Sequence, residues 1–217
     1  MIISEGRRFV FVHIPKTGGT AMALALEARA MKDDILIGDT PKARARKGRL
    51  AQLGAPGRLW KHSTLRDLGG VVDMTGFRIV TLVRNPWDRM VSYYHWLRAQ
   101  RFDHPAVTMA KVLPFRDFLR HPQTVASITA NPYAAYVTDA AGVMRATDFV
   151  RLEHFNDDMD GVFRHLGFRF ELPRVNASER KRDWRGFYGD RDAALIAQCC
   201  AADIERSGYR FDPAHSC

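Results

Sequence analysis

The sequence predicts an α/β fold: one domain over residues 1–217 with a central, mostly parallel sheet flanked by helices. Short runs of apolar, β-branched and aromatic residues, which are typical of buried strands, lie at 9–13, 77–83 and 148–152. Stretches of helical composition follow these runs at 21–28, 87–97 and about 156–166. Strands that alternate with helices form a parallel sheet covered on both faces.

The first strand leads directly into a glycine turn and a helix. Pro15 to Gly19 interrupts the apolar run, and Thr20 is placed to cap a helix of strong helix formers. Residues 41–57 are rich in Arg, Lys, Gly and Pro and predict an exposed loop or a frayed helix. The basic residues of this stretch are Lys42, Arg44, Arg46, Lys47 and Arg49. We expect a short strand at 58–60, just before His62.

The second strand ends at Arg84 and Asn85, and Pro86 suits the first turn of the helix that follows. Between 101 and 145 the chain is expected to form short helices and loops, because it is broken by Pro105, Pro114, Pro122 and Pro132. The tail predicts a polar loop over 176–185 and a last helix from about 190 to 207.

Composition indicates a globular protein that can bury a proper core, with 46% hydrophobic and 26% charged residues in 217. No apolar run approaches the ~20 residues of a membrane span, and residues 1–8 lack the pattern of a signal peptide. We therefore expect a cytoplasmic protein. Cys199, Cys200 and Cys217 form neither a disulfide framework nor a zinc-site spacing, and we interpret them as free thiols.

A net charge of +9 favours anionic partners such as nucleotides, nucleic acid, acidic glycans or anionic lipid, although solubility alone also accounts for it. In the segment from His13 to Thr20, HIPKTGGT, a positive charge lies in a recognisable local structure, a glycine turn before a helix. A glycine turn before a helix presents unpaired backbone N–H groups and the positive end of the helix dipole. Gly18 and Gly19 allow close approach of the backbone to an anion, Lys16 adds a positive charge, and Thr17 and Thr20 add hydroxyl groups.

This loop differs from a Walker A loop, in which the lysine follows the last glycine and a magnesium-binding Ser or Thr comes next. Here Lys16 precedes Gly18 and Gly19, and we find no convincing carboxylate at a strand end that would hold Mg²⁺. The sequence therefore predicts a P-loop-like phosphate site without a metal.

Arg84 and Ser92 form the second motif. An arginine at the end of a buried strand is costly unless it meets an anion, and Ser92 lies two turns into the following helix. The two side chains are suited to a second phosphate. The alternative is that Arg84 pairs with Asp88 and that Ser92 is only a tolerated helical serine.

Together the two motifs resemble the nucleotide site of the sulfotransferase superfamily, which uses 3′-phosphoadenosine 5′-phosphosulfate (PAPS). HIPKTGGT resembles the 5′-phosphosulfate loop of the carbohydrate-type members, a group that includes heparan sulfate 2-O-sulfotransferase-like and bacterial-style proteins. VRNPWDRMVS, from Val83 to Ser92, resembles their 3′-phosphate motif. Weaker similarity continues at 61–63, 150–153, 203–204 and 209–211, whereas 101–145 match nothing in the family.

The resemblance implies a role for each matching residue. Lys16 would contact the 5′-phosphosulfate and the bridging oxygen of the leaving group. The rest of the loop would complete the phosphosulfate site with Pro15, Thr17, Gly18, Gly19 and Thr20. Arg84 and Ser92 would hold the 3′-phosphate, and 180–182 would close over it. Sulfuryl transfer from PAPS, leaving PAP, also fits a site without metal, because lysine and backbone donors can stabilise the smaller charge involved.

Transfer to a hydroxyl, or less readily to an amine, needs a base, and histidine is suited to that near neutral pH. The resembled family has its base at the place in the chain that His62 occupies, and Lys61 beside it would help to keep the imidazole neutral. The alternatives are a hydrogen-bonded or surface role for His62, or His13 as the base. We expect His13 to be structural and His95 to be packed among aromatic residues.

The acceptor is left open by the sequence. The basic stretch at 42–49 would suit an acidic glycan, or it is only a solvated loop. Two other functions compete with sulfuryl transfer: a metal-dependent kinase or NTPase that binds ATP at the glycine turn, and a non-catalytic nucleotide- or nucleic-acid-binding module. We expect no specific nucleic-acid partner, because the residues that the resembled sulfotransferase site requires are all present: Lys16, His62, Arg84 and Ser92.

Overall fold

The structure is a computed structural model that describes residues 1–173, 175 and 183–212. Its internal contacts divide the chain into two compact units. Unit 1 comprises 1–83 and 133–175, and unit 2 comprises 84–132 and 176–217. The prediction of one domain over 1–217 stays a prediction, and each unit is described by itself.

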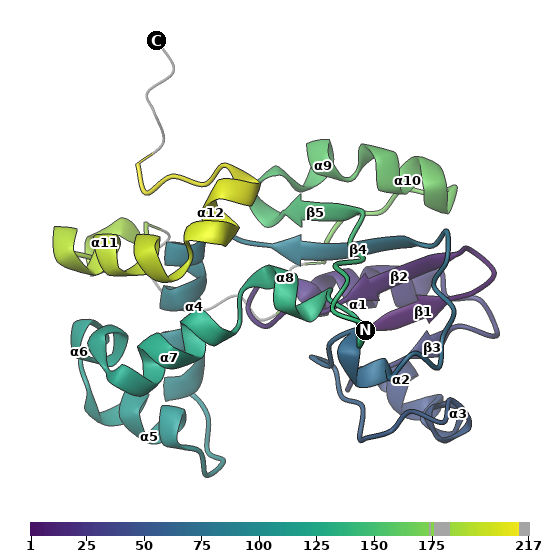
Figure 1. Cartoon of the computed structure of the whole chain (residues 1–217), viewed down its shortest axis with the longest axis horizontal. Helices are drawn as coiled ribbons and strands as arrows, with labels where there is room; N and C mark the ends of the chain where they lie inside the picture. The colour runs from purple at the N-terminus through teal and green to yellow at the C-terminus, as the bar shows by residue number, and fades with distance from the viewer. Residues whose placement is uncertain (174, 176–182, 213–217) are drawn as a thin grey trace. The chain divides into compact units, whose positions relative to one another are not determined.

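Unit 1 is built on a five-stranded sheet of order β3-β1-β2-β4-β5 (Figure 1). The strands are β1 (Ile2–Ser4), β2 (Phe9–Val12), β3 (Ile35–Leu36), β4 (Arg78–Val83) and β5 (Asp148–Arg151). β2 and β4 pair in parallel, as do β4 and β5, whereas β1 is antiparallel to both β2 and β3. Only β1 therefore runs against the other strands, and the predicted α/β fold with a mostly parallel sheet is confirmed in the form of a mixed sheet flanked by helices.

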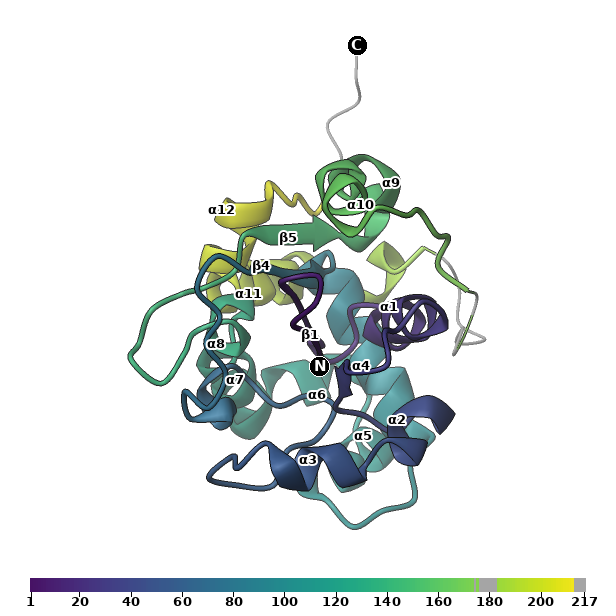
Figure 2. The same cartoon turned by 90° about the vertical axis from the view of Figure 1, so that its right-hand side faces the viewer.

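Alternate residues of β2 face two separate cores. Phe9 and Phe11 pack with Met22 and Leu26 of α1 (Gly19–Ala28) and with the helix α10 (Asp160–Leu166). Val10 and Val12 pack on the other side with residues at and beside the short helices η1 (Arg66–Leu68) and α8 (Tyr133–Tyr136). Figure 2 shows α1 and α8 on opposite sides of the sheet. Both faces are covered, as the pattern predicts, and β2 delivers its C-terminal end to the glycine turn.

The rest of unit 1 consists of short helices. They are α2 (Pro41–Ala45), α3 (Gly48–Gln52), η2 (Leu152–His154) and α9 (Phe155–Asp158). The basic stretch, expected as a loop or a frayed helix, forms α2 and α3, and α2 begins where the Thr40 hydroxyl accepts a hydrogen bond from the backbone N–H of Ala43. The predicted strand at 58–60 is wrong. Mutual hydrogen bonds between Trp60 and Ser63 make a turn there instead.

Unit 2 is helical in its described part. Its elements are α4 (Pro86–Arg98), α5 (Pro105–Val112), α6 (Phe115–Arg120), α7 (Pro122–Ala130), η3 (Arg185–Phe187), α11 (Asp190–Cys199) and α12 (Ala201–Ser207). Prolines begin or cap the helices α4 to α7, because a proline at the first turn sacrifices no helical hydrogen bond. The predicted last helix is broken at Cys200. Cys199 and Cys200 are free thiols, as expected, while Cys217 lies outside the described residues.

Within the described ranges, no helix combines the length and the apolar character that a membrane crossing requires.

Candidate functional site

The loop from His13 to Gly18 joins the end of β2 to the start of α1, so the predicted order of strand, turn and helix is present. Lys16 has a φ of 67° and Gly18 has a φ of 88°, both in the left-handed region. A lysine there costs on the order of 1 kcal/mol relative to an ordinary conformation, because its Cβ crowds the following carbonyl. The backbone strain at Lys16 is typical of a position whose side chain is held for function.

The two glycines of the loop are required by packing as well as by backbone geometry. A Cβ on Gly18 would lie 2.8 Å from the Leu152 side chain, and its φ is unfavourable for other residues. A Cβ on Gly19 would overlap the ring of His13, only 1.9 Å from its Cδ2. The sequence explains these glycines by the approach of an anion. The structure adds that His13 and Leu152 occupy the space that side chains would need.

The first turn of α1 presents backbone donors and no acidic side chain. The Met22 N–H bonds to the Gly18 carbonyl, and among the described residues no acceptor lies at the N–H groups of Gly19, Thr20 and Ala21. The prediction that Thr20 caps the helix is wrong, because Gly18 is the N-cap and Thr20 lies inside the first turn. Three such N–H groups and the positive end of the helix dipole are suited to an anion.

Thr17 stabilises the loop from inside. Its side chain is fully buried, and its hydroxyl donates to the carbonyl oxygen of Ile14 at 3.0 Å. The hydroxyl predicted to be a ligand donor is therefore used to hold the turn, whereas Lys16 and Thr20 are half-buried.

His62 is attached to the same loop. Its Nδ1 lies 2.9 Å from the carbonyl oxygen of His13, and the two imidazole rings meet nearly at right angles with centroids 4.5 Å apart. A carbonyl oxygen can only accept a hydrogen bond, so Nδ1 carries the proton and the neutral ring has its lone pair on Nε2. The structure thus connects the predicted base to the predicted phosphate loop, although the two residues are 49 positions apart.

Burial keeps both imidazoles neutral. It lowers the pKa of His62 from 6.5 to about 4; the hydrogen bond to His13 opposes this shift, and the charge of Lys61 adds to it. Burial likewise lowers the pKa of His13 well below its ordinary value, with smaller contributions from His62 and Lys16. The expectation that Lys61 helps to keep His62 neutral has the correct sign, but burial is the larger cause.

Arg84 and Ser92 belong to unit 2, with Arg84 directly before the N-cap Asn85 of α4 and Ser92 buried within that helix. The Arg84 guanidinium donates from Nε at 2.8 Å and from Nη2 at 2.6 Å to one oxygen of Asp88. This is the alternative pairing that the sequence left open. A guanidinium has five N–H donors, so the ion pair alone does not decide against a phosphate contact.

Three other expectations from the sequence concern His95, the loop residues 180–182 and a metal site. His95 packs edge-on against Tyr94 and Phe187, as expected for a residue in an aromatic environment. The loop residues 180–182 lie outside the described residues. In the part of the chain that the structure describes, no group of three or more His, Cys, Asp or Glu side chains is arranged to hold a metal ion.

Sequence reasoning missed Arg58 and Trp60. Both line a cavity of about 670 Å³ in unit 1 that continues to Lys61, the neighbour of His62. An exposed tryptophan two residues before the candidate base is a local signal for such a surface, since tryptophan is usually buried for most of its area.

No protein-family model matches the sequence, and a search of curated proteins found no match. Among solved structures, the chain is similar to mouse sulfotransferase SULT7A1 complexed with PAP, with a TM-score of 0.46, 14% sequence identity and coverage of 93% of this chain and 85% of that chain. Such identity and TM-score assign no function to this chain.

Proposed function

We propose that this chain is a PAPS-dependent sulfotransferase that moves a sulfuryl group to a hydroxyl acceptor, or less readily to an amine. One observation carries the proposal: the imidazole of His62 is hydrogen-bonded to the phosphate loop that contains Lys16 and leads into the N-terminal N–H groups of α1. A hydrogen bond thus connects the candidate base to the candidate anion site. The resemblance of both motifs to the carbohydrate-type family suggests which anion is bound.

The loop has the right chemistry for a 5′-phosphosulfate. The N–H groups of Gly19, Thr20 and Ala21 offer donors, Lys16 offers a positive charge, and no acidic side chain lies in the first turn of α1 to repel an anion. The Thr17 hydroxyl, bonded to the carbonyl of Ile14, holds the turn that presents them, and Pro15 belongs to the same turn. Arg84 and Ser92 of unit 2 remain the residues proposed for the 3′-phosphate.

Bound PAPS would supply the sulfuryl group. As the acceptor oxygen bonds to sulfur, the bond between sulfur and the bridging oxygen of the 5′-phosphate breaks, and the electron pair stays on that oxygen. Lys16 and the α1 N–H groups would stabilise the charge that develops there. His62 would take the hydroxyl proton on Nε2, while the carbonyl of His13 holds the Nδ1 proton and fixes the tautomer.

The low pKa of His62, about 4, keeps it unprotonated at neutral pH but also makes it a weak base. An anion bound at the adjacent loop raises the pKa of an imidazole, because a nearby negative charge favours the protonated ring. We therefore expect nucleotide binding to increase the basicity of His62, so that the residue is most effective when PAPS is present.

The partners in this proposal are PAPS, its product PAP and an unidentified hydroxyl-bearing acceptor. We retain the cytoplasmic location as part of it. The proposal requires neither a resident metal ion nor a nucleic-acid partner.

Thermal stability and calorimetric binding with PAP, AMP and ATP test the proposal. A nucleotide at 100 times its Kd adds roughly 2.7 kcal/mol to the free energy of unfolding. We expect PAP to bind more tightly than AMP, Lys16→Met to weaken both nucleotides, and Arg84→Ala to weaken PAP alone. Lys32→Met removes an exposed lysine of the same unit as Lys16 and serves as the control.

Two results would favour the competing functions. Stabilisation by ATP alone, with Mg²⁺-dependent turnover, would indicate a kinase or NTPase. Binding of DNA or RNA that falls steeply with salt, without any response to PAP, would indicate a nucleic-acid-binding module. His62→Ala completes the test of mechanism: it should abolish sulfuryl transfer and leave PAP affinity nearly unchanged, so full activity in this variant would remove His62 from the reaction.

A further inference from the structure

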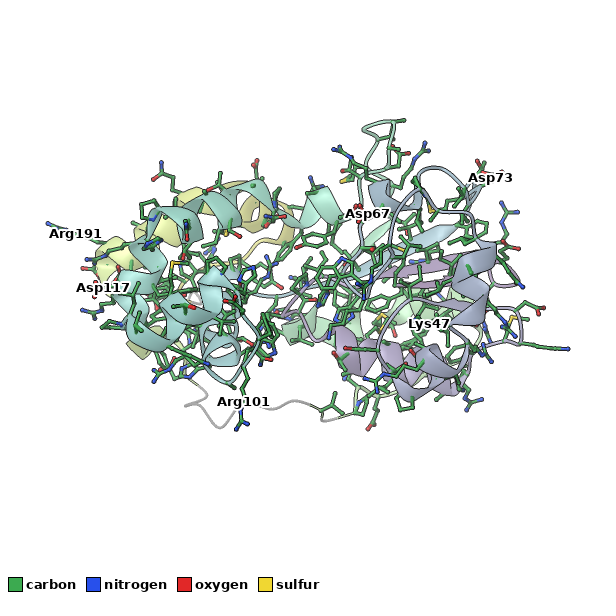
Figure 3. The ribbon with its side chains drawn as sticks, turned by 90° about the horizontal axis from the view of Figure 1, so that it is seen from below. Lys47, Asp67, Asp73, Arg101, Asp117 and Arg191 are labelled. Carbon is green, nitrogen blue, oxygen red and sulfur yellow. The ribbon has the colours of Figure 1, made fainter. Side chains whose placement is uncertain are left out.

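The cavity lined by Trp60 and Lys61, the two residues before His62, has the size of a small-molecule site. Its volume of about 670 Å³ lies within the range of roughly 300–1,000 Å³ typical of ligand pockets. Its walls come from α2, α3 and the segments that precede and follow them, all within unit 1. Lys47, labelled in Figure 3, lies between the two helices.

The basic stretch at 42–49 divides into two groups with different contacts. Lys42, Arg46 and Arg49 donate to the backbone carbonyls of Glu27, Met31 and Lys32, respectively. These three side chains therefore attach α2 and α3 to the end of α1 and to the loop after it. Arg44 and Lys47 do not take part in this attachment and line the cavity instead. The sequence offers two alternatives for this stretch, a substrate surface or a solvated loop, and neither describes all five basic residues.

The cavity has an excess of positive charge. Its charged lining residues are Asp39, Arg44, Lys47, Arg58 and Lys61. Asp39 forms an ion pair of 2.7 Å with Lys61, which accounts for the single carboxylate of the lining. Within the described residues, no carboxylate lies within ion-pair distance of Arg44, Lys47 or Arg58, although Arg44 contributes to the electrostatic field at Asp39. Three exposed cations thus surround a concave surface, which favours an anionic ligand.

Trp60 connects the cavity to the candidate base. It is 55% exposed, and its ring lies perpendicular to that of His62 with centroids 4.9 Å apart. Leu50 and Leu59 add apolar area to the same lining. A tryptophan face binds the flat, apolar side of a ring, so this wall is suited to a cyclic ligand.

We propose that this cavity binds the acceptor, and that the acceptor is a hydroxyl-bearing ring compound with a carboxylate. The carboxylate is held by Arg44, Lys47 and Arg58, and the ring packs on Trp60. This inference rests on the proposed function, because it takes His62 as the group that receives the hydroxyl proton. A phenolic acid and a uronic-acid sugar share the required chemistry.

Calorimetry with two matched pairs of probes distinguishes a phenolic acid from a uronic-acid sugar. The aromatic pair is 4-hydroxybenzoate and the neutral 4-hydroxybenzamide, and the sugar pair is 4-nitrophenyl β-glucuronide and the neutral 4-nitrophenyl β-glucoside. We expect at least one carboxylate probe to bind about tenfold more tightly than its neutral partner, the order of effect for one charge-assisted contact. The pair that shows this preference identifies the ring.

The double variant Arg44→Gln/Lys47→Gln should remove the preference for the carboxylate, and Trp60→Leu should weaken both members of the pair. The control is Arg101→Gln/Lys111→Gln, which removes two exposed cations from unit 2. Circular dichroism and unchanged thermal unfolding establish that each variant is folded. A preference that survives the Arg44 and Lys47 changes would overturn the proposal, as would the absence of measurable binding of both carboxylate probes.

PAP affinity is measured on the same variants. It should stay unchanged in the cavity variants, whereas a parallel loss would show that the cavity belongs to the nucleotide site and would overturn its assignment to the acceptor. If PAP fails to bind the unmodified chain while the carboxylate preference is present, the sulfotransferase proposal fails and the anion-binding cavity stands. The two failures are therefore distinguishable.

Discussion

Replacing His62 with glutamine tests whether burial holds its imidazole neutral. Glutamine keeps an N–H donor for the carbonyl of His13 but does not titrate, so the variant removes the proton equilibrium with little change in shape. In the folded chain the pKa of His62 is about 4, whereas its ordinary value is 6.5. Because the folded pKa is the lower one, the unfolded chain binds the proton first as the pH falls.

The magnitude follows from these two values. A difference of about 2.5 pKa units corresponds to about 3 kcal/mol of lost stability once the pH is below the folded pKa of about 4. Between about pH 7 and about pH 5 the expected loss from this residue is roughly 2 kcal/mol, because most of the unfolded chains, but few folded ones, are protonated there. His13 is retained in both proteins, so its own contribution, of the same sign, largely cancels in the comparison.

Urea unfolding at several pH values between about 7 and 5 measures the effect. The free energy of unfolding of the unmodified chain should fall more steeply with decreasing pH than that of His62→Gln, by roughly 2 kcal/mol over this interval. Equal pH dependence in the two proteins would contradict this prediction, because it would mean that His62 titrates alike in the folded and unfolded chains. A reversal would mean that the folded chain stabilises the imidazolium.

Two further predictions concern the loop and the helix of the second motif. Gly19→Ala should lower the free energy of unfolding by about 1–3 kcal/mol, because the new Cβ would overlap the His13 ring. Gly48→Ala should be neutral or slightly stabilising, because nothing lies within 4 Å of its new Cβ. Equal urea midpoints for the two variants would contradict this prediction. Asn85→Ala should cost about 1–2 kcal/mol, because the Asn85 side chain accepts from the N–H groups of Trp87 and Asp88 and donates to the carbonyl oxygen of Arg210. Asn85→Asp keeps only the accepted hydrogen bonds, so it should recover only part of the loss in the same assay.

The local features of the fold are predictable from the sequence. The apolar runs give β2, β4 and β5, and the prolines mark the starts of the helices of unit 2, because strand propensity and proline geometry act within a few residues. The loop after β2 is found in the same way. β1 and β3, of three and two residues, are too short to show any pattern. Their place at the sheet depends on pairing with distant residues.

The order of strand, glycine turn and helix follows from residues that are close in the chain, and together with the family resemblance these patterns point to Lys16 and His62 as candidate functional residues. Folding brings His62 to the carbonyl of His13, buries it so that its pKa falls, and places the ring of His13 where a side chain at position 19 would lie. It also separates the basic stretch into residues that anchor two helices and residues that line a cavity. The physical reason is the same in each case: hydrogen bonds, desolvation and steric overlap depend on which residues, distant in the chain, are brought together by folding.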